Sequence, residues 1–267
     1  MVVDTAPRPR QYWDDYASRF KNRSVADAYE LRPPYPDETY EILRELLGES
    51  PGRVLDVGCG PGKIARILVD YVDGVDAVDF SEEMIVAGNS LANGNHPRLQ
   101  WIHGRVEEVE WSPPYAMVTA GASIHWMEWR DVFPRFRKAM PDGGYVVIID
   151  GDRPVEPPWR EAELVLIREF STNPHYEDID LILELEERGH ILPLGDRLTE
   201  PVYFSQSIRD YVGSFHSRES MSVEHMGVEN AAVFDAELTS ILRDYAHDGG
   251  TLSFDLQTRV SWGRPLG

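Results

Sequence analysis

Short apolar runs alternate with segments of helical spacing along the first 150 residues of the chain. The runs lie at 53–57, 74–79, 99–103, 116–120 and 145–150, and each has the length of a buried strand. Between most of them, apolar residues recur every three or four positions, which predicts helices. Strands and helices that alternate in this way form a parallel, doubly wound sheet, so the pattern predicts a Rossmann-like α/β fold.

The residues that cap helices refine this prediction. Ser81 is a typical N-cap for a helix over 82–91, and Asp37 is expected to cap a helix that ends at Leu47. Further helices are expected over 11–30, after Gly62 and over 129–140.

The pattern changes after Asp150. A proline-rich connection leads into two helices, 161–170 and 177–188, with no strand between them, which is typical of an inserted helical lid. The runs 202–207 and 252–262 alternate like edge strands, and we expect them to complete a seven-stranded, mostly parallel sheet. The predicted organisation is an N-terminal helical cap (1–50), a core (51–150), a helical lid (151–200) and C-terminal strands that complete the core sheet (201–267).

The charge balance narrows the range of partners. Asp and Glu number 46 against 26 Lys and Arg, which gives a formal net charge of −20, and no Lys/Arg cluster interrupts the sequence. Such a charge repels phosphate backbones and anionic membrane surfaces. We therefore expect a small-molecule substrate, and neither a nucleic-acid nor a membrane partner.

Cysteine usage and hydropathy bear on the cellular compartment. Cys59 is the single cysteine, so no intrachain disulfide can form. The N-terminus has no apolar core of signal-peptide length, and the longest apolar run, 145–149, is too short to cross a bilayer. These features predict a cytoplasmic protein and leave its oligomeric state open, with a homo-oligomer among the alternatives.

A glycine-rich turn after the first strand carries the strongest chemical signal. Gly58, Gly60 and Gly62 permit positive φ and close approach of a ligand, and the next helix begins with unpaired N–H groups. In open α/β sheets, ligands bind outside the carboxyl ends of the strands, where this turn lies. A dinucleotide fingerprint would need its third glycine at the position of Lys63, so the spacing disfavours a nicotinamide cofactor.

The segment Val54-Leu55-Asp56-Val57-Gly58-Cys59-Gly60-Pro61-Gly62 resembles motif I of class I S-adenosylmethionine (SAM)-dependent methyltransferases. The resemblance implies that SAM is the cofactor, with Gly58 and Gly60 against its methionine part. It also implies that Asp56 orients the loop and the cofactor's amino group. No carboxylate triad for a metal ion can be assigned.

The end of the second strand extends this resemblance. Asp79 lies 21 residues past Gly58, where a carboxylate can accept hydrogen bonds from both ribose hydroxyls. The segment from Asp79 to Met84 resembles the acidic loop of the family, which implies that Phe80 and Met84 pack on adenine.

The third strand leads into a segment similar to the adenine-edge segment of the family. It reads Gly104-Arg105-Val106-Glu107, and Arg105 replaces the usual acidic residue. Because arginine has no acceptor for the adenine amino group, that contact is not expected here. The resemblance implies a hydrogen bond from the backbone of Val106 to adenine.

The fourth strand leads into Ala120-Gly121-Ala122-Ser123-Ile124-His125-Trp126, which resembles the motif IV region of methyltransferases related to trans-aconitate methyltransferase. The resemblance implies that the backbone at Ala120 faces the sulfonium and that the His-Trp pair lines the acceptor side. If the acceptor must lose a proton, His125 is the first candidate base, because histidine titrates near neutral pH. Trp126 is a candidate to stabilise a cationic acceptor.

The N-terminal segment supplies further candidates. The stretch from Tyr29 to Pro36 resembles a Y-x-x-R-P-x-Y-P segment of related families, in which Arg32 would pair with the cofactor carboxylate. Tyr12 and Tyr16 share one helical face and are candidates to close over cofactor and acceptor, with Tyr16 as an alternative base.

The segment Ser214-Phe215-His216-Ser217-Arg218 falls where related enzymes place residues that contact the acceptor. It makes His216 a candidate base and Arg218 a candidate acceptor ligand. Structural packing is the alternative role for each.

Three functions follow from these observations. The favoured one is a SAM-dependent methyltransferase that acts on nitrogen or oxygen of a small molecule, such as a secondary-metabolite intermediate. The alternatives are a nicotinamide-dependent oxidoreductase and a binding protein that keeps the SAM pocket without catalysis. The sequence does not identify the acceptor.

Overall fold

The structure is a computed structural model that describes residues 9, 23–49, 52–151, 154–175 and 179–267. Its core is a seven-stranded sheet with the order β3-β2-β1-β4-β5-β9-β6. The parallel part, whose strands pair in one direction, consists of β1 (Arg53–Val57), β2 (Gly74–Asp79), β3 (Leu99–His103), β4 (Met117–Gly121) and β5 (Tyr145–Asp150). β9 (Arg259–Pro265) runs antiparallel to both β5 and β6 (Ile191–Leu198). This arrangement confirms the Rossmann-like, mostly parallel fold.

Helices cover both faces of the sheet, and this is why its central strands read as continuous apolar runs. Every residue of β2 is buried. One face packs against α6 (Trp129–Ala139), whose Phe133 and Phe136 are fully buried. The other packs against α3 (Asp37–Leu47) and α4 (Ala65–Leu68), which contribute Leu43 and Leu68. The helix α5 (Glu82–Ser90) contacts β2 and β3.

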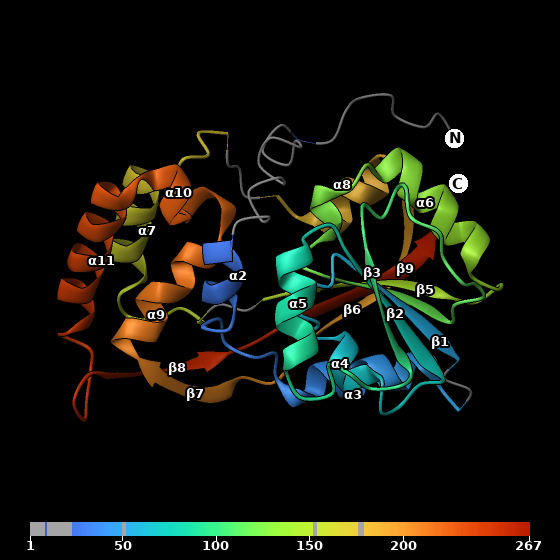
Figure 1. Cartoon of the computed structure of the whole chain (residues 1–267), viewed down its shortest axis with the longest axis horizontal. Coiled ribbons are helices and arrows are strands. Elements are labelled where there is room, and N and C mark those ends of the chain that lie inside the picture. Colours follow the sequence, from blue (N-terminus) through green and yellow to red (C-terminus); the bar gives the residue numbers. More distant parts are fainter. Residues whose placement is uncertain (1–8, 10–22, 50–51, 152–153, 176–178) are drawn as a thin grey trace.

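A second lobe, defined here as residues 154–175 and 202–256, lies beside the core (Figure 1). Its two-stranded antiparallel sheet pairs β7 with β8 and has its own apolar cluster, which includes Trp159, Tyr211, Phe215 and Phe234. Its elements are α7 (Arg160–Phe170), β7 (Val202–Ser207), α9 (Ile208–Ser214), η4 (Phe215–Ser217), η5 (Glu219–Met221), α10 (Val223–Met226), α11 (Val228–Leu242) and β8 (Thr251–Leu256).

The expected return of two late runs to the core sheet is wrong in part. The run 202–207 forms β7, which pairs with β8 in the second lobe, and only the end of 252–262 enters the core, as part of β9. The sixth core strand, β6, comes from 191–198, where a helical lid was expected. Alternation identifies a strand but not its partner, and Phe204 and Phe254 pack on the apolar cluster of the second lobe.

Helix boundaries also differ in detail from the prediction. Ser81 accepts a hydrogen bond from the Met84 amide and caps α5 as expected. By contrast, Pro36 occupies the cap position of α3 without a side-chain hydrogen bond, so Asp37 begins the helix instead of capping it. The helix after the glycine turn is short. Of the expected helix over 11–30, the described part is α2 (Arg23–Tyr29), and α8 (Leu181–Glu187) covers the later part of 177–188.

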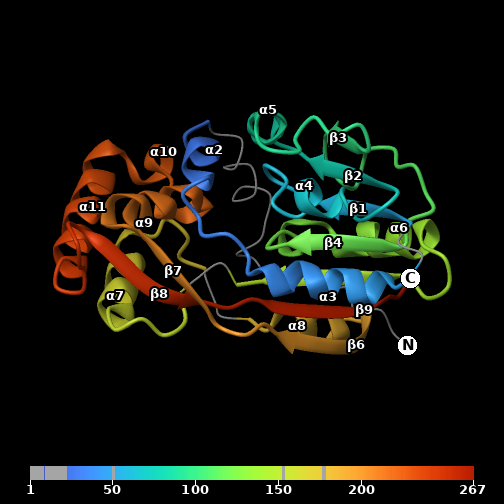
Figure 2. The same cartoon turned by 90° about the horizontal axis from the view of Figure 1, so that it is seen from below.

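Three of the passages of the chain between the lobes meet at one place. Thr199 and Thr258, from two crossings, exchange hydrogen bonds through the Thr199 N–H (2.9 Å) and the Thr258 N–H (3.0 Å). The Thr258 hydroxyl also donates to the Gly151 carbonyl of the third crossing at 2.8 Å. Figure 2 shows β8 continuing into β9 along this path, while the arrowhead of β4 points toward the second lobe. The carboxyl ends of the parallel strands therefore face the second lobe.

Candidate active site

The turn between β1 and α4 has the backbone that its glycines predict. Gly58, Gly60 and Gly62 have φ values of 60°, 53° and 76°, a region that other residues rarely adopt. A Cβ atom on Gly58 would lie 2.5 Å from the Cβ of Ser123, and one on Gly62 would lie 2.6 Å from the Trp101 ring. Both neighbours therefore require glycine, and the turn stays compact at the carboxyl edge of the sheet.

Asp79 joins the end of β2 to this turn. Its Oδ2 accepts a hydrogen bond from the Gly60 amide at 2.8 Å, and its Oδ1 accepts one from the Ser81 amide at 2.8 Å. Burial raises the pKa of Asp79 to about 6, although these amides oppose the rise. The Phe80 amide is a further backbone donor to this carboxylate. The predicted ribose contact stays a prediction.

Asp56 lies in β1, two residues before the first glycine of the turn, and is 1% exposed. Its Oδ1 accepts from the Thr119 hydroxyl at 2.8 Å, and its Oδ2 accepts from the Ala65 amide at 3.2 Å. Asp56 thus links β1 to β4 and to the first residue of α4. Burial raises its pKa to about 7. Thr119 was not among the residues predicted from the sequence, although it pairs with Asp56 in the register of neighbouring strands.

The His-Trp segment lies against the glycine turn. Its backbone turns at Ala122, which has φ 49° and donates its N–H to Ile149 at 2.9 Å. The Ser123 hydroxyl donates to the Val57 carbonyl at 2.6 Å, which fixes the segment to the end of β1. His125 and Trp126 follow in a 3₁₀ turn, η3 (Ile124–Trp126), and their ring centroids are 4.8 Å apart.

These contacts bring the predicted acceptor side next to the predicted cofactor turn. Ser123, which makes the junction, was not singled out from the sequence. The strand residue Ala120 is fully buried nearby, at the end of β4.

The predicted adenine side is less open than expected. Met84 is 2% exposed and packs with Val25 and Ala26 of α2. Val106 is 5% exposed, and its carbonyl accepts from Arg135 at 2.5 Å. Phe80 is half-buried at the end of β2. The proposed contacts of Phe80, Met84 and Val106 with adenine stay predictions.

Arg32 makes a connection that the sequence did not indicate. Its Nε donates to the Ser217 hydroxyl at 2.6 Å, and its second guanidinium nitrogen donates to the Ser217 carbonyl at 3.1 Å. The guanidinium also lies 4.5 Å from the centre of the Tyr29 ring. The predicted pairing with the cofactor carboxylate stays a prediction.

His216 and Arg218 lie in the second lobe. The His216 Nδ1 is 2.8 Å from the Met221 carbonyl and its Nε2 is 2.9 Å from the Asp235 carboxylate, so both nitrogens face acceptors. Burial lowers the pKa of His216, but these hydrogen bonds outweigh it and the pKa is raised. A doubly protonated ring has no lone pair for a proton, so this geometry does not favour a base. The Arg218 guanidinium lies 4.2 Å from the centre of the Phe215 ring.

Tyr12 and Tyr16 lie outside the described residues. Within the described ranges, no group of three or more His, Cys, Asp or Glu side chains is arranged to hold a metal ion. Nor does any helix in that part of the chain have the length and apolarity to cross a membrane.

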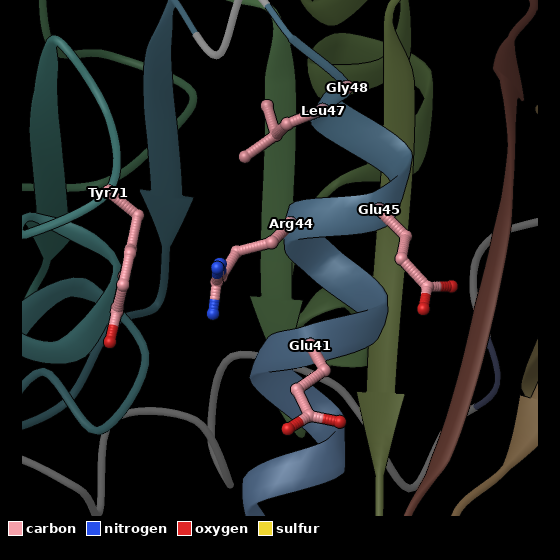
Figure 3. A pocket seen from close by; sticks show the side chains of 6 residues that line it. All are labelled: Glu41, Arg44, Glu45, Leu47, Gly48 and Tyr71. Carbon is pink, nitrogen blue, oxygen red and sulfur yellow. The ribbon is translucent and has the colours of Figure 1, made fainter.

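A surface pocket of about 590 Å³ lies elsewhere, on the outer side of α3 (Figure 3). The Arg44 guanidinium lies 4.4 Å from the centre of the Tyr71 ring there, and Glu41 and Glu45 complete its polar lining. No predicted site residue lines this pocket, so we do not assign the chemistry to it.

The strand order and the glycine turn at the carboxyl edge of the sheet are those of a Rossmann-like α/β fold. Residues 54–144 match the family described as "Methyltransferase domain". A trans-aconitate 2-methyltransferase from Mycolicibacterium gilvum (strain PYR-GCK) is 31% identical over 113 residues, which are 40% of this chain and 41% of that protein. The chain therefore matches less than half the length of this relative.

Two solved structures share the fold. A candidate type II methyltransferase from Anaeromyxobacter dehalogenans aligns with a TM-score of 0.64 at 20% identity, covering 87% of this chain and 97% of that one. A SAM-dependent methyltransferase from Thiobacillus denitrificans, in complex with S-adenosyl-L-homocysteine, aligns with a TM-score of 0.51 at 15% identity, covering 91% and 97%. At these identities the likeness concerns the fold.

Proposed function

We propose that this chain is a SAM-dependent methyltransferase that acts on a small-molecule acceptor. The observation that carries the proposal is the 2.8 Å hydrogen bond from the Gly60 amide to the Asp79 carboxylate. It holds the Asp79 carboxylate, the proposed ribose ligand, beside a glycine turn at the carboxyl edge of the sheet, within the segment that matches the methyltransferase domain family.

The residues at this edge fit the cofactor. Gly58 and Gly60 add no side chain of their own where the turn would meet a methionine moiety, Asp79 would accept from the ribose hydroxyls, and Phe80 would offer a flat surface to adenine. When bound, SAM supplies an activated methyl group on a sulfonium. The protein then contributes position and exclusion of water, which are worth up to ~7–11 kcal/mol in well-oriented systems.

His125 and Trp126 are the proposed acceptor-side residues because Ser123 ties their turn to the end of β1. An acceptor hydroxyl must lose a proton during transfer, and His125 would accept it. A carboxylate or a neutral amine needs no base, and Trp126 would then stabilise positive charge on a methylated amine.

The acceptor atom is proposed to be oxygen or nitrogen. Because several relatives are named trans-aconitate 2-methyltransferase, carboxylates are the first acceptors to test. The net charge of −20 opposes a highly anionic acceptor, so hydroxyl and amine intermediates of secondary metabolism form the second arm. We propose that the reaction takes place in the cytoplasm.

The test is binding followed by turnover. Calorimetry should show SAM and S-adenosylhomocysteine binding and no binding of NAD. Incubation with labelled SAM and a panel of carboxylates, hydroxylated metabolites and amines should then transfer the label. Binding of NAD in place of SAM would favour an oxidoreductase, while SAM binding without transfer to any acceptor would favour a non-catalytic SAM-binding protein.

A further inference from the structure

The two lobes also touch away from the place where Gly151, Thr199 and Thr258 meet. The short helix α2 packs against η4 of the second lobe and against α5 of the core. Figures 1 and 2 both place α2 between α5 and the helices of the second lobe. Val25 and Ala26 form the core side of this contact with Met84. The second lobe is thus attached through the chain crossings and, separately, through α2.

Arg32 makes the polar part of this second attachment. Its two hydrogen bonds go to the hydroxyl and the carbonyl of Ser217, which is fully buried in η4. The Ser217 hydroxyl donates in turn to the Ser214 carbonyl at the end of α9. A planar guanidinium can reach two such acceptors at once, whereas an ammonium is a point donor.

The same guanidinium is connected to the glycine turn through Tyr29. A Cβ atom on Gly60 would lie 3.7 Å from the Tyr29 ring, so the ring lies against the turn. Lys63 comes from the other end of the turn and donates to the Pro33 carbonyl at 2.9 Å and to the Arg32 carbonyl at 3.3 Å. Its ammonium lies 5.4 Å from the centre of the Tyr29 ring. The turn therefore holds the segment around Arg32 from two sides.

We propose that Arg32 is a positioning residue that couples the glycine turn to the second lobe. A ligand that reduces the motion of the turn would also reduce the motion of Tyr29 and of the backbone at Arg32. Through the two hydrogen bonds of Arg32, it would then reduce the motion of Ser217. Cofactor binding would then fix the second lobe over the carboxyl ends of the strands before the acceptor is methylated. This inference rests on the proposed function, since SAM is the ligand that acts on the turn.

Hydrogen exchange measured by mass spectrometry tests the coupling without an acceptor, with S-adenosylhomocysteine as the probe. In the wild type, the probe should slow exchange at the turn, 58–63, and also at 215–221, by about fivefold or more in each segment. In Arg32→Ala, measured with the probe at a concentration that saturates the variant, slowing at 58–63 should persist and slowing at 215–221 should disappear.

Three further variants sharpen the test. Arg32→Lys keeps the charge but loses the fork, so it should behave like the alanine variant. Ser217→Ala keeps the carbonyl acceptor and should retain part of the slowing at 215–221, which keeps the inference testable if Arg32→Ala does not fold. Arg209→Ala changes an exposed arginine on α9 and should match the wild type.

The outcomes separate the two proposals. No slowing at 58–63 in the wild type would contradict cofactor binding itself. Slowing at 58–63 without slowing at 215–221 in the wild type would overturn the coupling alone. So would an Arg32→Ala protein that, saturated with the probe, keeps the slowing at 215–221.

Discussion

In the core, β2 buries all six of its residues and ends in a carboxylate that binds the Gly60 amide, whereas the buried residues of the second lobe are chiefly rings and aliphatic chains. The aromatic side chains of Trp159, Tyr211 and Phe254 meet edge to face in that lobe. Its buried Glu163 accepts a hydrogen bond from Tyr211 within the same packed cluster.

This difference separates two kinds of constraint. The glycine turn tolerates few substitutions because a Cβ atom would overlap a neighbour or require a strained backbone. An apolar cluster accepts many residues of similar volume. The core is therefore more constrained in sequence than the second lobe. The family match covers residues 54–144 and ends before the second lobe begins.

The largest difference in stability between the second lobe and the core should come from a cavity in the apolar cluster of the second lobe. Phe234 is fully buried in α11, and Phe234→Ala should cost about 3–5 kcal/mol through lost packing and a cavity. Hydrogen exchange should rise across α9 and α11, while SAM still binds the core. Val233→Ala, at a 46% exposed neighbour on the same helix, is the control and should be nearly neutral. Equal unfolding of the core in Phe234→Ala would show that the lobes form one cooperative unit.

The next effect concerns the core. Asp79→Ala removes the acceptor for the Gly60 amide and for the ribose, so SAM affinity should fall about 100-fold. Equilibrium dialysis measures the dissociation constant, and Asp255→Ala, at an exposed position on β8, serves as the control. An unchanged dissociation constant would reject the ribose role of Asp79.

A third effect separates binding from chemistry. His125→Ala should lower kcat about 100-fold for a hydroxyl acceptor if His125 is the base, with the dissociation constant of SAM within a few fold of the wild-type value. Steady-state kinetics and calorimetry provide the two numbers. A matched loss of turnover and cofactor affinity would indicate that His125 supports the turn structurally.

The smallest effect concerns pH and stability. Burial raises the pKa of Asp56 to about 7, so the stability it contributes is full below its unfolded pKa near 4 and is lost as pH rises through about 7. The melting temperature should therefore fall between pH 5.5 and 8. The melting temperature should fall less in Asp56→Asn. The Asn side chain can accept a hydrogen bond from the Ala65 backbone N–H through its oxygen and donate one to the Thr119 hydroxyl oxygen through its nitrogen. Self-repulsion of the acidic chain acts on both proteins, so only the difference between them is diagnostic. Parallel curves would contradict the raised pKa.

The sequence predicted the core well because local and global signals agree there. β1, β3 and β5 begin and end where apolar runs bounded by turns placed them, and Ser81 caps α5 as expected. The strand orders of 191–198 and 202–207 could not be predicted in the same way. The run 191–198 does not alternate apolar and polar residues, so it gave no strand signal. For 202–207, only packing on a distant cluster decides which sheet it joins.

The candidate site was predictable as far as it depends on motifs. Gly58, Gly60 and Asp79 were found from spacing, and the structure brings them together. Contacts across the fold were not predictable, because the bond from Arg32 to Ser217 joins residues 185 positions apart in the chain. Ser123 had a weaker signal, a small residue following a strand that neighbours the glycine turn.

The strand order has a consequence for how the chain is synthesised. β9 lies between β5 and β6 in the sheet. In a nascent chain whose synthesis has not yet reached Arg259, β6 is already made, but β9, the strand that it pairs with, is not. Until β9 has been made, the edges of β5 and β6 that it pairs with have no partner strand in this sheet. A ribosome stalled between β6 and β9 would present both edges to other chains, and a chaperone that shields them would have its greatest effect at that stage.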